Sequence, residues 1–291
     1  MSRVVILGCG YVGSHLARAA LAAGRPVRVC ARGTGKLAPL GALGAEIKYL
    51  DVRTPKQLPL ALASSQGACV IYSIPAAATS PPGHALRGAL QAAYGAGCAC
   101  FIYLSSSGLY GANPDDDVWV DEDTPVAHDD PAMTNALADE FELDNCSFER
   151  LRIVTLRLAP VYGPNRGVRE RLRKGDYRLF DDGSHATSRI YIDDLVAIVQ
   201  AAEERGEHKS KYLVADDEPT TQGAYAQWLC ERLKLPLPPS RAIFEPGAPQ
   251  VAHRNRKIRN AKLKRELAIE LRYPSFREGE AAIDAAEATR G

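Results

Sequence analysis

Three glycines near the start of the chain have the spacing of a phosphate-binding turn. Gly8, Gly10 and Gly13 form a G-x-G-x-x-G pattern directly after the apolar run Val4–Leu7. In a strand–turn–helix unit the first glycine permits a tight turn, the second lets a pyrophosphate approach the backbone, and the third brings helix and strand together. The following helix would direct its free N–H groups at the phosphates. The pattern predicts a dinucleotide site, although a glycine-rich turn without a ligand would share the spacing.

The end of the second expected strand, Pro26–Ala31, indicates which dinucleotide the site would bind. Arg32 follows that strand at once, Lys36 comes shortly after, and no carboxylate lies between them. An acidic residue here would bind the ribose 2′-hydroxyl and repel a 2′-phosphate, whereas the arginine fork suits a phosphate. We therefore expect NADP, with NAD less favoured. The alternative is a solvated surface arginine.

Further cofactor contacts are expected where other strands end. Asp51 and Val52 follow the third strand, and Asp51 could either accept from the adenine amine or cap the next turn. A loop of small residues after the fourth strand would contact the middle of the cofactor. The predicted dinucleotide-binding residues are Gly8, Gly10, Tyr11, Val12, Gly13, Arg32, Asp51, Val52, Ser73, Ile74, Pro75, Ser105 and Pro160.

Strand and helix patterns alternate along the first two-thirds of the chain. This alternation predicts an α/β protein with a Rossmann-type, doubly wound parallel sheet. Residues beyond the carboxyl ends of such strands line the ligand crevice, which places the hydroxyls of Ser105, Ser106 and Ser107 there. A serine-rich turn that makes only local backbone bonds is the alternative.

Composition narrows the possible partners. The chain has 291 residues and a formal net charge of +1, which gives no reason to expect nucleic acid or an anionic membrane surface as a partner. No apolar run is long enough for a membrane span, and we expect a cytoplasmic protein. The seven cysteines lack zinc-site spacing, so we expect reduced thiols and no metal.

Four segments together resemble a known family. They are the glycine turn, Ser105–Gly111, Leu156–Pro164 and Ser188–Leu195. In this order they are similar to the extended short-chain dehydrogenases/reductases, the NAD(P)-dependent epimerase/dehydratase-like proteins, over nearly the whole length. Extended members usually carry G-x-x-G-x-x-G, so the chain looks most like the atypical members.

The resemblance implies an organisation and an assembly. It implies a Rossmann domain over residues 1–165, completed by about 190–215, and a small C-terminal substrate lobe made of 166–189 and 216–291. It also implies a homodimer, formed through the helices expected at Ala85–Gly97 and Ala132–Asn145.

The resemblance further implies hydride transfer coupled to proton transfer, and here the chain departs from the family. The family serine matches Ser106. Its Tyr-x-x-x-Lys pair, in which the cation lowers the pKa of the phenol, falls on Ala132 and Ala136 when the glutamate that follows the motif is placed on Glu140. Replacement acid/base candidates facing the same crevice are Tyr110, Asp121, Glu122 and His128.

Three hypotheses follow for the function. The first is an NADP-dependent oxidoreductase or epimerase-like enzyme with a non-standard acid/base, acting on a polar carbonyl or sugar-nucleotide-type substrate. The second is chemistry that needs little acid–base help, such as reduction of an activated double bond or an iminium. The third is a non-catalytic NADP-binding redox sensor or interaction protein.

Basic residues of the C-terminal part indicate an acidic substrate. In relatives that act on nucleotide sugars, cations in this lobe hold a diphosphate, and an exposed charged helix is the alternative. We expect Ser107, Tyr162, Arg166 and Arg189 to bind substrate, with Arg189 as the main anion contact. The basic segment His253–Lys264 would also face an acidic ligand. Asp182-Gly183 predicts a hairpin turn.

Overall fold

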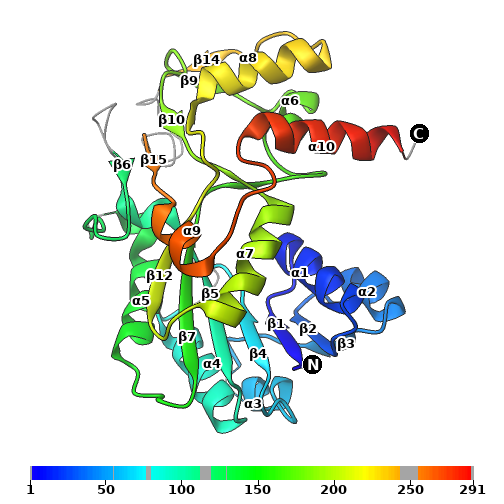
Figure 1. Ribbon diagram of the computed structural model, residues 1–291, viewed down its shortest axis with the longest axis vertical. Helices are drawn as coiled ribbons and strands as arrows, with labels where there is room; N and C mark the ends of the chain where they lie inside the picture. Colours follow the sequence, from blue (N-terminus) through cyan, green and yellow to red (C-terminus); the bar gives the residue numbers. More distant parts are fainter. Residues whose placement is uncertain are drawn as a thin grey trace.

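The computed structural model describes residues 2–54, 56–76, 80–111, 119–128, 130–242 and 255–289. At its centre is a parallel sheet with the strand order β12-β7-β5-β4-β1-β2-β3 (Figure 1). The strands are β1 (Val4–Leu7), β2 (Val27–Ala31), β3 (Glu46–Tyr49), β4 (Cys69–Tyr72), β5 (Cys100–Ser106), β7 (Arg152–Leu158) and β12 (Ser210–Val214). This order confirms the predicted doubly wound sheet.

The central strands are apolar because both faces of the sheet are covered. Every residue of β1 is buried, and its neighbours β2 and β4 pair with it in parallel, with Val4 opposite both Val27 and Cys69. Continuous apolar runs of this kind are expected where helices pack on both sides. The sheet is therefore the rigid base from which all the site loops emerge.

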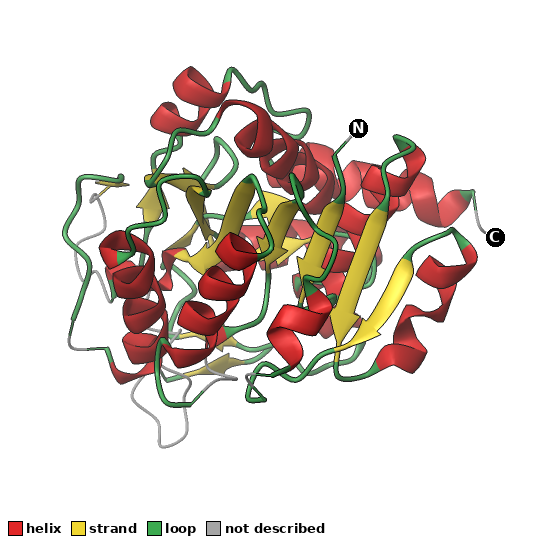
Figure 2. Cartoon of the chain, turned by 90° about the horizontal axis from the view of Figure 1, so that it is seen from below, coloured by secondary structure: helices red, strands yellow, loops and turns green. Residues whose placement is uncertain are grey.

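Helices cover the two faces of the sheet, as the view from below shows (Figure 2). One apolar layer includes residues of α1 (Tyr11–Ala22), α2 (Ala38–Ala42) and α7 (Ile192–Arg205). The opposite layer includes residues of α3 (Gln57–Ala61), α4 (His84–Gly95) and α5 (Thr134–Asn145). Short 3₁₀ turns are η1 (Thr34–Leu37), η3 (Ser107–Tyr110) and η4 (Pro131–Met133).

A second group of elements lies above the carboxyl ends of the strands (Figure 1). Its helices are α6 (Val168–Arg173), α8 (Gln222–Leu233) and α10 (Phe276–Ala288), whereas α9 (Ala261–Leu267) packs beside α7 and β12. The short strands are β6 (Trp119–Val120), β8 (Val161–Tyr162), β9 (Leu179–Phe180), β10 (Ala186–Thr187), β11 (Ile190–Tyr191), β13 (Thr220–Thr221), β14 (Ser240–Arg241) and β15 (Lys257–Ile258).

The prediction of a hairpin at Asp182-Gly183 is wrong. The flanking strands do not pair with each other: β9 pairs with β14 in parallel, and β10 pairs with β13 in antiparallel orientation. A turn does form, since Gly183 has φ +75° and its N–H donates to Phe180. Tertiary partners that are remote in sequence take the strand edges that a local hairpin would have used.

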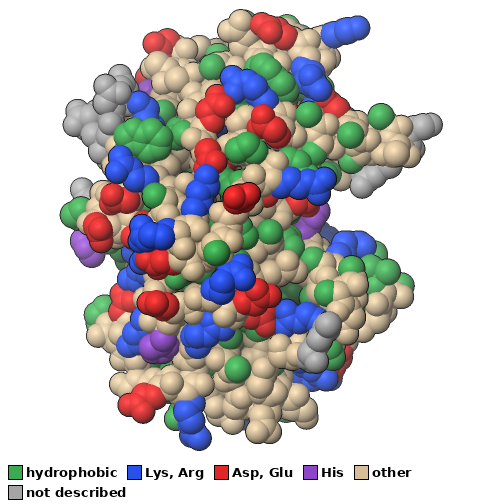
Figure 3. Space-filling view, viewed as in Figure 1, with side chains coloured by type: hydrophobic (Ala, Val, Ile, Leu, Met, Phe, Trp, Pro, Cys, Tyr) green, Lys and Arg blue, Asp and Glu red, His purple; other side chains and the backbone are tan. Residues whose placement is uncertain are grey.

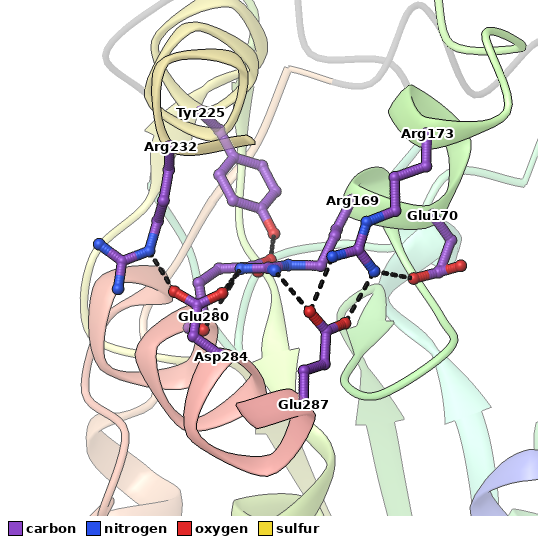
Figure 4. Close-up of polar contacts among 8 residues, drawn as sticks. All are labelled: Arg169, Glu170, Arg173, Tyr225, Arg232, Glu280, Asp284 and Glu287. Atoms are coloured by element: carbon purple, nitrogen blue, oxygen red, sulfur yellow. Dashed lines mark hydrogen bonds and ion pairs between the residues drawn. The ribbon is translucent and has the colours of Figure 1, made fainter. Parts of the chain in front are cut away.

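Charged side chains anchor the C-terminal helix α10 to helices α6 and α8 (Figure 4). The Arg169 guanidinium on α6 is 2% exposed. Its Nε lies 2.6 Å from Glu280 Oε2, and its Nη2 lies 2.7 Å from Asp284 Oδ1. Tyr225 on α8 also donates to Glu280. Since α6 begins two residues after Arg166, this network holds the base of the loop that carries Arg166.

Among the described helices, none combines the length and the apolar character that a membrane span requires.

Candidate functional site

Two adjoining cavities lie at the carboxyl edge of the sheet. The larger, of about 590 Å³, lies over β1, β2 and β4, and the smaller, of about 290 Å³, lies over β5 and β7. We call them the cofactor cavity and the substrate cavity. Arg166 lines both. In the space-filling view the surface is indented between α10 and the region of α1 and α2, with basic and acidic side chains interspersed over that face (Figure 3).

The glycine turn forms the floor of the cofactor cavity. Gly8 has φ +93°, and a Cβ there would meet Ile74 Cγ1 at 2.5 Å, so this position requires glycine. A Cβ on Gly13 would approach Ile6 at 3.0 Å, which reflects the close contact of α1 with β1. By contrast, a Cβ on Gly10 would meet nothing within 4 Å. The structure thus leaves open space above Gly10.

The first turn of α1 is suited to an anion. Its N-cap is Gly10, no side chain caps the turn, and no acidic residue lies in it. Free N–H groups and the positive end of the helix dipole therefore face the cofactor cavity. An uncapped helix start beside a backbone with no Cβ fits a pyrophosphate, so the residues present are suited to a dinucleotide.

The tip of β2 supplies positive charge to the same cavity. Arg32 is exposed, lines the cavity together with Lys36, and takes part in none of the hydrogen bonds or ion pairs found among the described residues. Asp51 is bound by Arg53, with Nη2 of Arg53 2.6 Å from Oδ2. The hydrogen bonds from Arg53 lower the pKa of Asp51 to about 2. Asp51 is thus held as an anion beside Arg32.

The loop after β4 closes the middle of the cofactor cavity. Ser73 donates to the carbonyl of Gly8 at 2.7 Å, and Ile74 packs over that glycine. Asn135, near the start of α5, donates to the carbonyl of Ala76 in the same loop. Of the predicted dinucleotide-binding residues, the structure places in this cavity Gly8, Gly10, Tyr11, Val12, Gly13, Arg32, Asp51, Val52, Ser73, Ile74 and Pro75.

Arg166 stands at the junction of the two cavities in a defined orientation. Its Nε donates to the carbonyl of Val161 at 3.1 Å, and its guanidinium lies 5.0 Å from the ring centre of Tyr11. Tyr11 in turn donates to the carbonyl of Pro164. These contacts leave the two Nη groups of Arg166 without a partner in the described part of the chain. The guanidinium is therefore preorganised for an anion.

Hydroxyls and a second arginine line the substrate cavity. Ser106 Oγ accepts from the N–H of Gly108 at 3.0 Å, which leaves its own hydrogen available to a ligand oxygen. The other predicted residues in the wall are Ser105, Ser107 and Pro160. Arg256, which the sequence placed only in a basic segment, also lines the cavity and donates to the carbonyl of Gly111 at 2.7 Å.

A buried polar network lies behind this cavity. The Ser105 hydroxyl donates to Glu140 at 2.7 Å, and Arg157 Nη2 lies 2.7 Å from the same carboxylate. Arg157 also donates to the hydroxyl of Tyr110 at 2.6 Å. Burial raises the pKa of Tyr110 despite the nearby arginine. Tyr110 does not line the cavity. Its raised pKa keeps the phenol protonated near neutral pH, so Tyr110 offers no base there.

The two positions predicted for the family's acid/base pair have different surroundings. Ala132 lies in η4 and is exposed, whereas Ala136 is buried in α5. The replacement candidates are engaged elsewhere: Asp121 bonds Thr124, and Glu122 accepts from the N–H of Leu213.

His128, the remaining candidate, is exposed and lies outside the substrate cavity. Among the described residues of that cavity wall there is no Tyr, Lys, His, Asp or Glu.

Two predicted substrate residues lie outside the cavity. Tyr162 is 3% exposed, and its hydroxyl contacts the carbonyl of Ser275 on the α10 side. Arg189 is buried, with its guanidinium 4.0 Å from the ring centre of Tyr225 and its Nη2 donating to Thr187. Thr187 and Ser188 line the cavity, whereas Arg189, between β10 and β11, packs against Tyr225 and Phe276 behind it.

Arg189 has an unusual neighbour. Asp216 follows β12, is fully buried, and its carboxylate oxygens have no hydrogen-bond partner in the described structure. Burial raises the pKa of Asp216 to about 8, against the attraction of Arg189.

Among the described residues, no group of three or more His, Cys, Asp and Glu side chains could hold a metal.

Comparisons with known proteins agree with this geometry. The sequence model of the NAD dependent epimerase/dehydratase family matches residues 4–215. No curated protein matches the chain. A functionally unknown conserved protein from Silicibacter pomeroyi is 27% identical, with a TM-score of 0.81 over 98% of this chain and 99% of that one.

Two other solved structures share the fold at lower identity. UDP-glucose 4-epimerase from Thermotoga maritima, solved with UDP-glucose, is 20% identical, with a TM-score of 0.82 and all of both chains covered. The Bordetella bronchiseptica enzyme WbmG, solved with NAD and UDP, is 20% identical, with a TM-score of 0.80 over 100% of this chain and 96% of that one.

Proposed function

The chain belongs to the NAD dependent epimerase/dehydratase family, and from this premise we propose that it is an NADP-dependent oxidoreductase or epimerase-like enzyme acting on a polar carbonyl compound. The observation that carries the proposal is the pair of adjoining cavities that share Arg166. One has the glycine turn and an uncapped helix start, and the other has the hydroxyl-rich end of β5. A bound dinucleotide would supply hydride transfer at its nicotinamide ring.

The chain's own residues would bind and orient the reactants. The open space above Gly10 and the first turn of α1 would hold the pyrophosphate, and Arg32 with Lys36 would hold a 2′-phosphate. Ser106 would donate its hydroxyl hydrogen to the substrate oxygen. Since the described cavity wall offers no group that titrates near neutral pH, the proposed substrate is one whose reduction needs little proton transfer from the protein, or whose proton comes from water.

The same observation supports a second candidate. A site that binds a dinucleotide, and whose described wall has no Tyr, Lys, His or carboxylate, would serve a non-catalytic redox sensor or interaction protein. The two candidates differ in turnover, since both require binding of the dinucleotide.

The test compares binding with turnover. NADPH and NADH are titrated by their fluorescence, and consumption of NADPH is followed over a panel of carbonyl compounds and sugar nucleotides. Tighter binding of NADPH than of NADH, together with consumption that falls in Ser106→Ala, supports the enzyme. Binding without consumption over the panel supports the sensor. Equal or tighter binding of NADH would refute the role of Arg32.

A homodimer remains part of the proposal. The surface helices α4 and α5 pack against each other, and α5 presents Phe141 with 62% of its surface exposed. An exposed aromatic side chain at this place is suited to a subunit contact. Light scattering coupled to gel filtration should give twice the monomer mass, and Phe141→Asp should give the monomer mass.

A further inference from the structure

One residue of the cofactor cavity comes from the second group of elements. Arg166 lies in the loop between β8 and α6, whereas the other described residues of the cavity wall lie between Gly8 and Pro75. Its side chain is exposed, so the guanidinium is accessible to a ligand. Arg166 therefore brings a positive charge from the second group of elements to a cavity whose described wall is otherwise built on residues 8–75.

Tyr11 fixes this guanidinium beside the start of α1. Tyr11 is the first residue of α1 and directly follows the N-cap Gly10. Its ring centre lies 5.0 Å from the Arg166 guanidinium carbon, and its hydroxyl donates to the carbonyl of Pro164 at 3.1 Å. Arg166 Nε donates to the carbonyl of Val161 at 3.1 Å. These contacts hold the charge next to the free N–H groups of the first helical turn.

The loop that carries Arg166 is itself held in place. Two backbone hydrogen bonds, of 3.0 and 3.2 Å, close it into a tight turn. Before the turn, the Tyr162 hydroxyl packs against Gly279 of α10 so closely that a Cβ there would collide with it. After the turn, Arg169 pairs with Glu280 of the same helix (Figure 4). Arg166 is thus fixed in backbone and side chain, and it loses little freedom on binding an anion.

The groups beside Arg166 indicate which anion it binds. A Cβ at Gly10 would meet no protein atom within 4 Å, so the space above the helix start is open. Helix N-termini bind phosphate groups, but the helix dipole offers only about half an elementary charge, less than a pyrophosphate needs for neutralisation. A guanidinium beside the same turn adds a full charge and a fork of donors that suits phosphate oxygens.

From these observations we propose that Arg166 clamps the pyrophosphate of the dinucleotide against the first turn of α1. The two Nη groups of Arg166 donate to phosphate oxygens, and the N–H groups of the turn bind other oxygens of the same pyrophosphate. The sequence predicted Arg166 as a substrate contact, whereas the clamp assigns its charge to the cofactor. The clamp rests on the proposed function and adds to it a contact between the second group of elements and the dinucleotide.

Two fragments of the cofactor separate this contact from the one proposed for Arg32. ADP-ribose contains the pyrophosphate but no 2′-phosphate, and 2′-AMP contains the 2′-phosphate but no pyrophosphate. Calorimetry measures the binding of both fragments and of NADP⁺. Arg166→Met should weaken ADP-ribose and NADP⁺ about tenfold or more and change 2′-AMP by less than about twofold. Arg32→Ala should give the opposite pattern with the two fragments. Arg166→Lys should recover part of the ADP-ribose affinity because the charge remains.

Arg171→Met is the matched control. Arg171 is an exposed arginine of α6 that pairs with exposed Asp176 and lines neither cavity. Its replacement should therefore leave the binding of all three probes unchanged. Thermal melting checks that each variant is folded.

The outcomes distinguish the clamp from the proposed function. A wild type that binds neither NADP⁺ nor ADP-ribose would refute both, since there would be no pyrophosphate to hold. If the wild type binds both and Arg166→Met binds ADP-ribose equally tightly, the clamp is overturned and the proposed function stands. An equal loss of ADP-ribose and 2′-AMP affinity in Arg166→Met would also overturn the clamp, because the substitution would then disturb the whole cavity.

Discussion

The cofactor cavity presents mainly backbone groups, whereas the substrate cavity presents mainly side chains. Backbone forms the functional part of the first: a glycine turn, an uncapped helix start and a loop that packs on Gly8. Side chains form the second, with oriented arginines in its wall, and the buried ion pair of Glu140 and Arg157 and the buried carboxyl of Asp216 behind it. A backbone site depends on a few local positions, whereas a side-chain site depends on remote contacts. The two should therefore respond differently to substitution and to pH.

The largest effect should come from Arg169, which is far from either ligand. Arg169→Met would leave Glu280, 1% exposed, as a buried charge without its arginine. Removing one partner of a buried pair costs about 3–5 kcal/mol in the free energy of unfolding. Arg173→Met, at the exposed edge of the same network, should cost under about 1 kcal/mol. Urea denaturation measures both, and similar losses would show that burial of the pair does not matter.

The second effect tests the backbone site. Because a Cβ at Gly10 meets no protein atom within 4 Å, Gly10→Ala should fold normally. Its methyl group would occupy the space proposed for the pyrophosphate, so NADP⁺ affinity should fall about a hundredfold, or about 2.8 kcal/mol. Gly35→Ala, also in open space but outside the cavity, is the control. Unchanged affinity in Gly10→Ala would contradict the position of the phosphates.

The third prediction concerns pH and belongs to the side-chain site. The Asp216 carboxyl ionises near pH 4 in an unfolded chain, but its pKa is about 8 in the folded protein. The folded state therefore holds the extra proton between these values, and the contribution of Asp216 to stability falls as pH rises from about 4 to about 8. The slope is up to about 1.4 kcal/mol per pH unit.

Asp216→Asn should remove that slope and be more stable than the wild type at pH 8. Chemical denaturation at pH 5, 6, 7 and 8 measures it. Asp176→Asn, at an exposed carboxylate, should keep the wild-type pH dependence. Parallel stability curves for Asp216→Asn and wild type would refute the raised pKa.

The smallest effect should occur at the tip of β2. Arg32 is exposed and has no hydrogen bond or ion pair among the described residues, so Arg32→Ala should leave the melting temperature nearly unchanged. The preference for NADPH over NADH should fall about tenfold, or about 1.4 kcal/mol. Fluorescence titration of both nucleotides measures it. A preference that survives the substitution would assign the selectivity to Lys36 or Arg166.

Much of the cofactor cavity could be predicted because its determinants are local in sequence. The turn follows from three glycines and the apolar run before them, and the parallel sheet follows from alternating strand and helix patterns. The position of Arg32 follows from the end of one strand. Even the absence of the family's acid/base pair could be found from the sequence, since it required only counting from Glu140 to Ala136 and Ala132.

The walls of the substrate cavity could not be predicted in the same way. Arg189 and Ser188 are adjacent in sequence, but opposite side-chain directions place only Ser188 in the wall. Arg256 is one of several basic residues in its segment. Its position depends on a hydrogen bond to the carbonyl of Gly111, 145 residues earlier in the chain. No pattern in either segment records such a contact, because it arises only when Arg256, just before β15, reaches the turn that follows β5.

The sequence by itself determined the fold, the family and the edge of the sheet where a dinucleotide would bind. These depend on short-range periodicity and on backbone positions that only glycine satisfies. The tertiary structure decided which arginines line the substrate cavity, placed Arg189 and Tyr162 outside it, and buried Asp216. Those outcomes depend on packing between segments that are distant in sequence. Whether a side chain is buried, and which charge it pairs with, follows only from the folded arrangement of these segments.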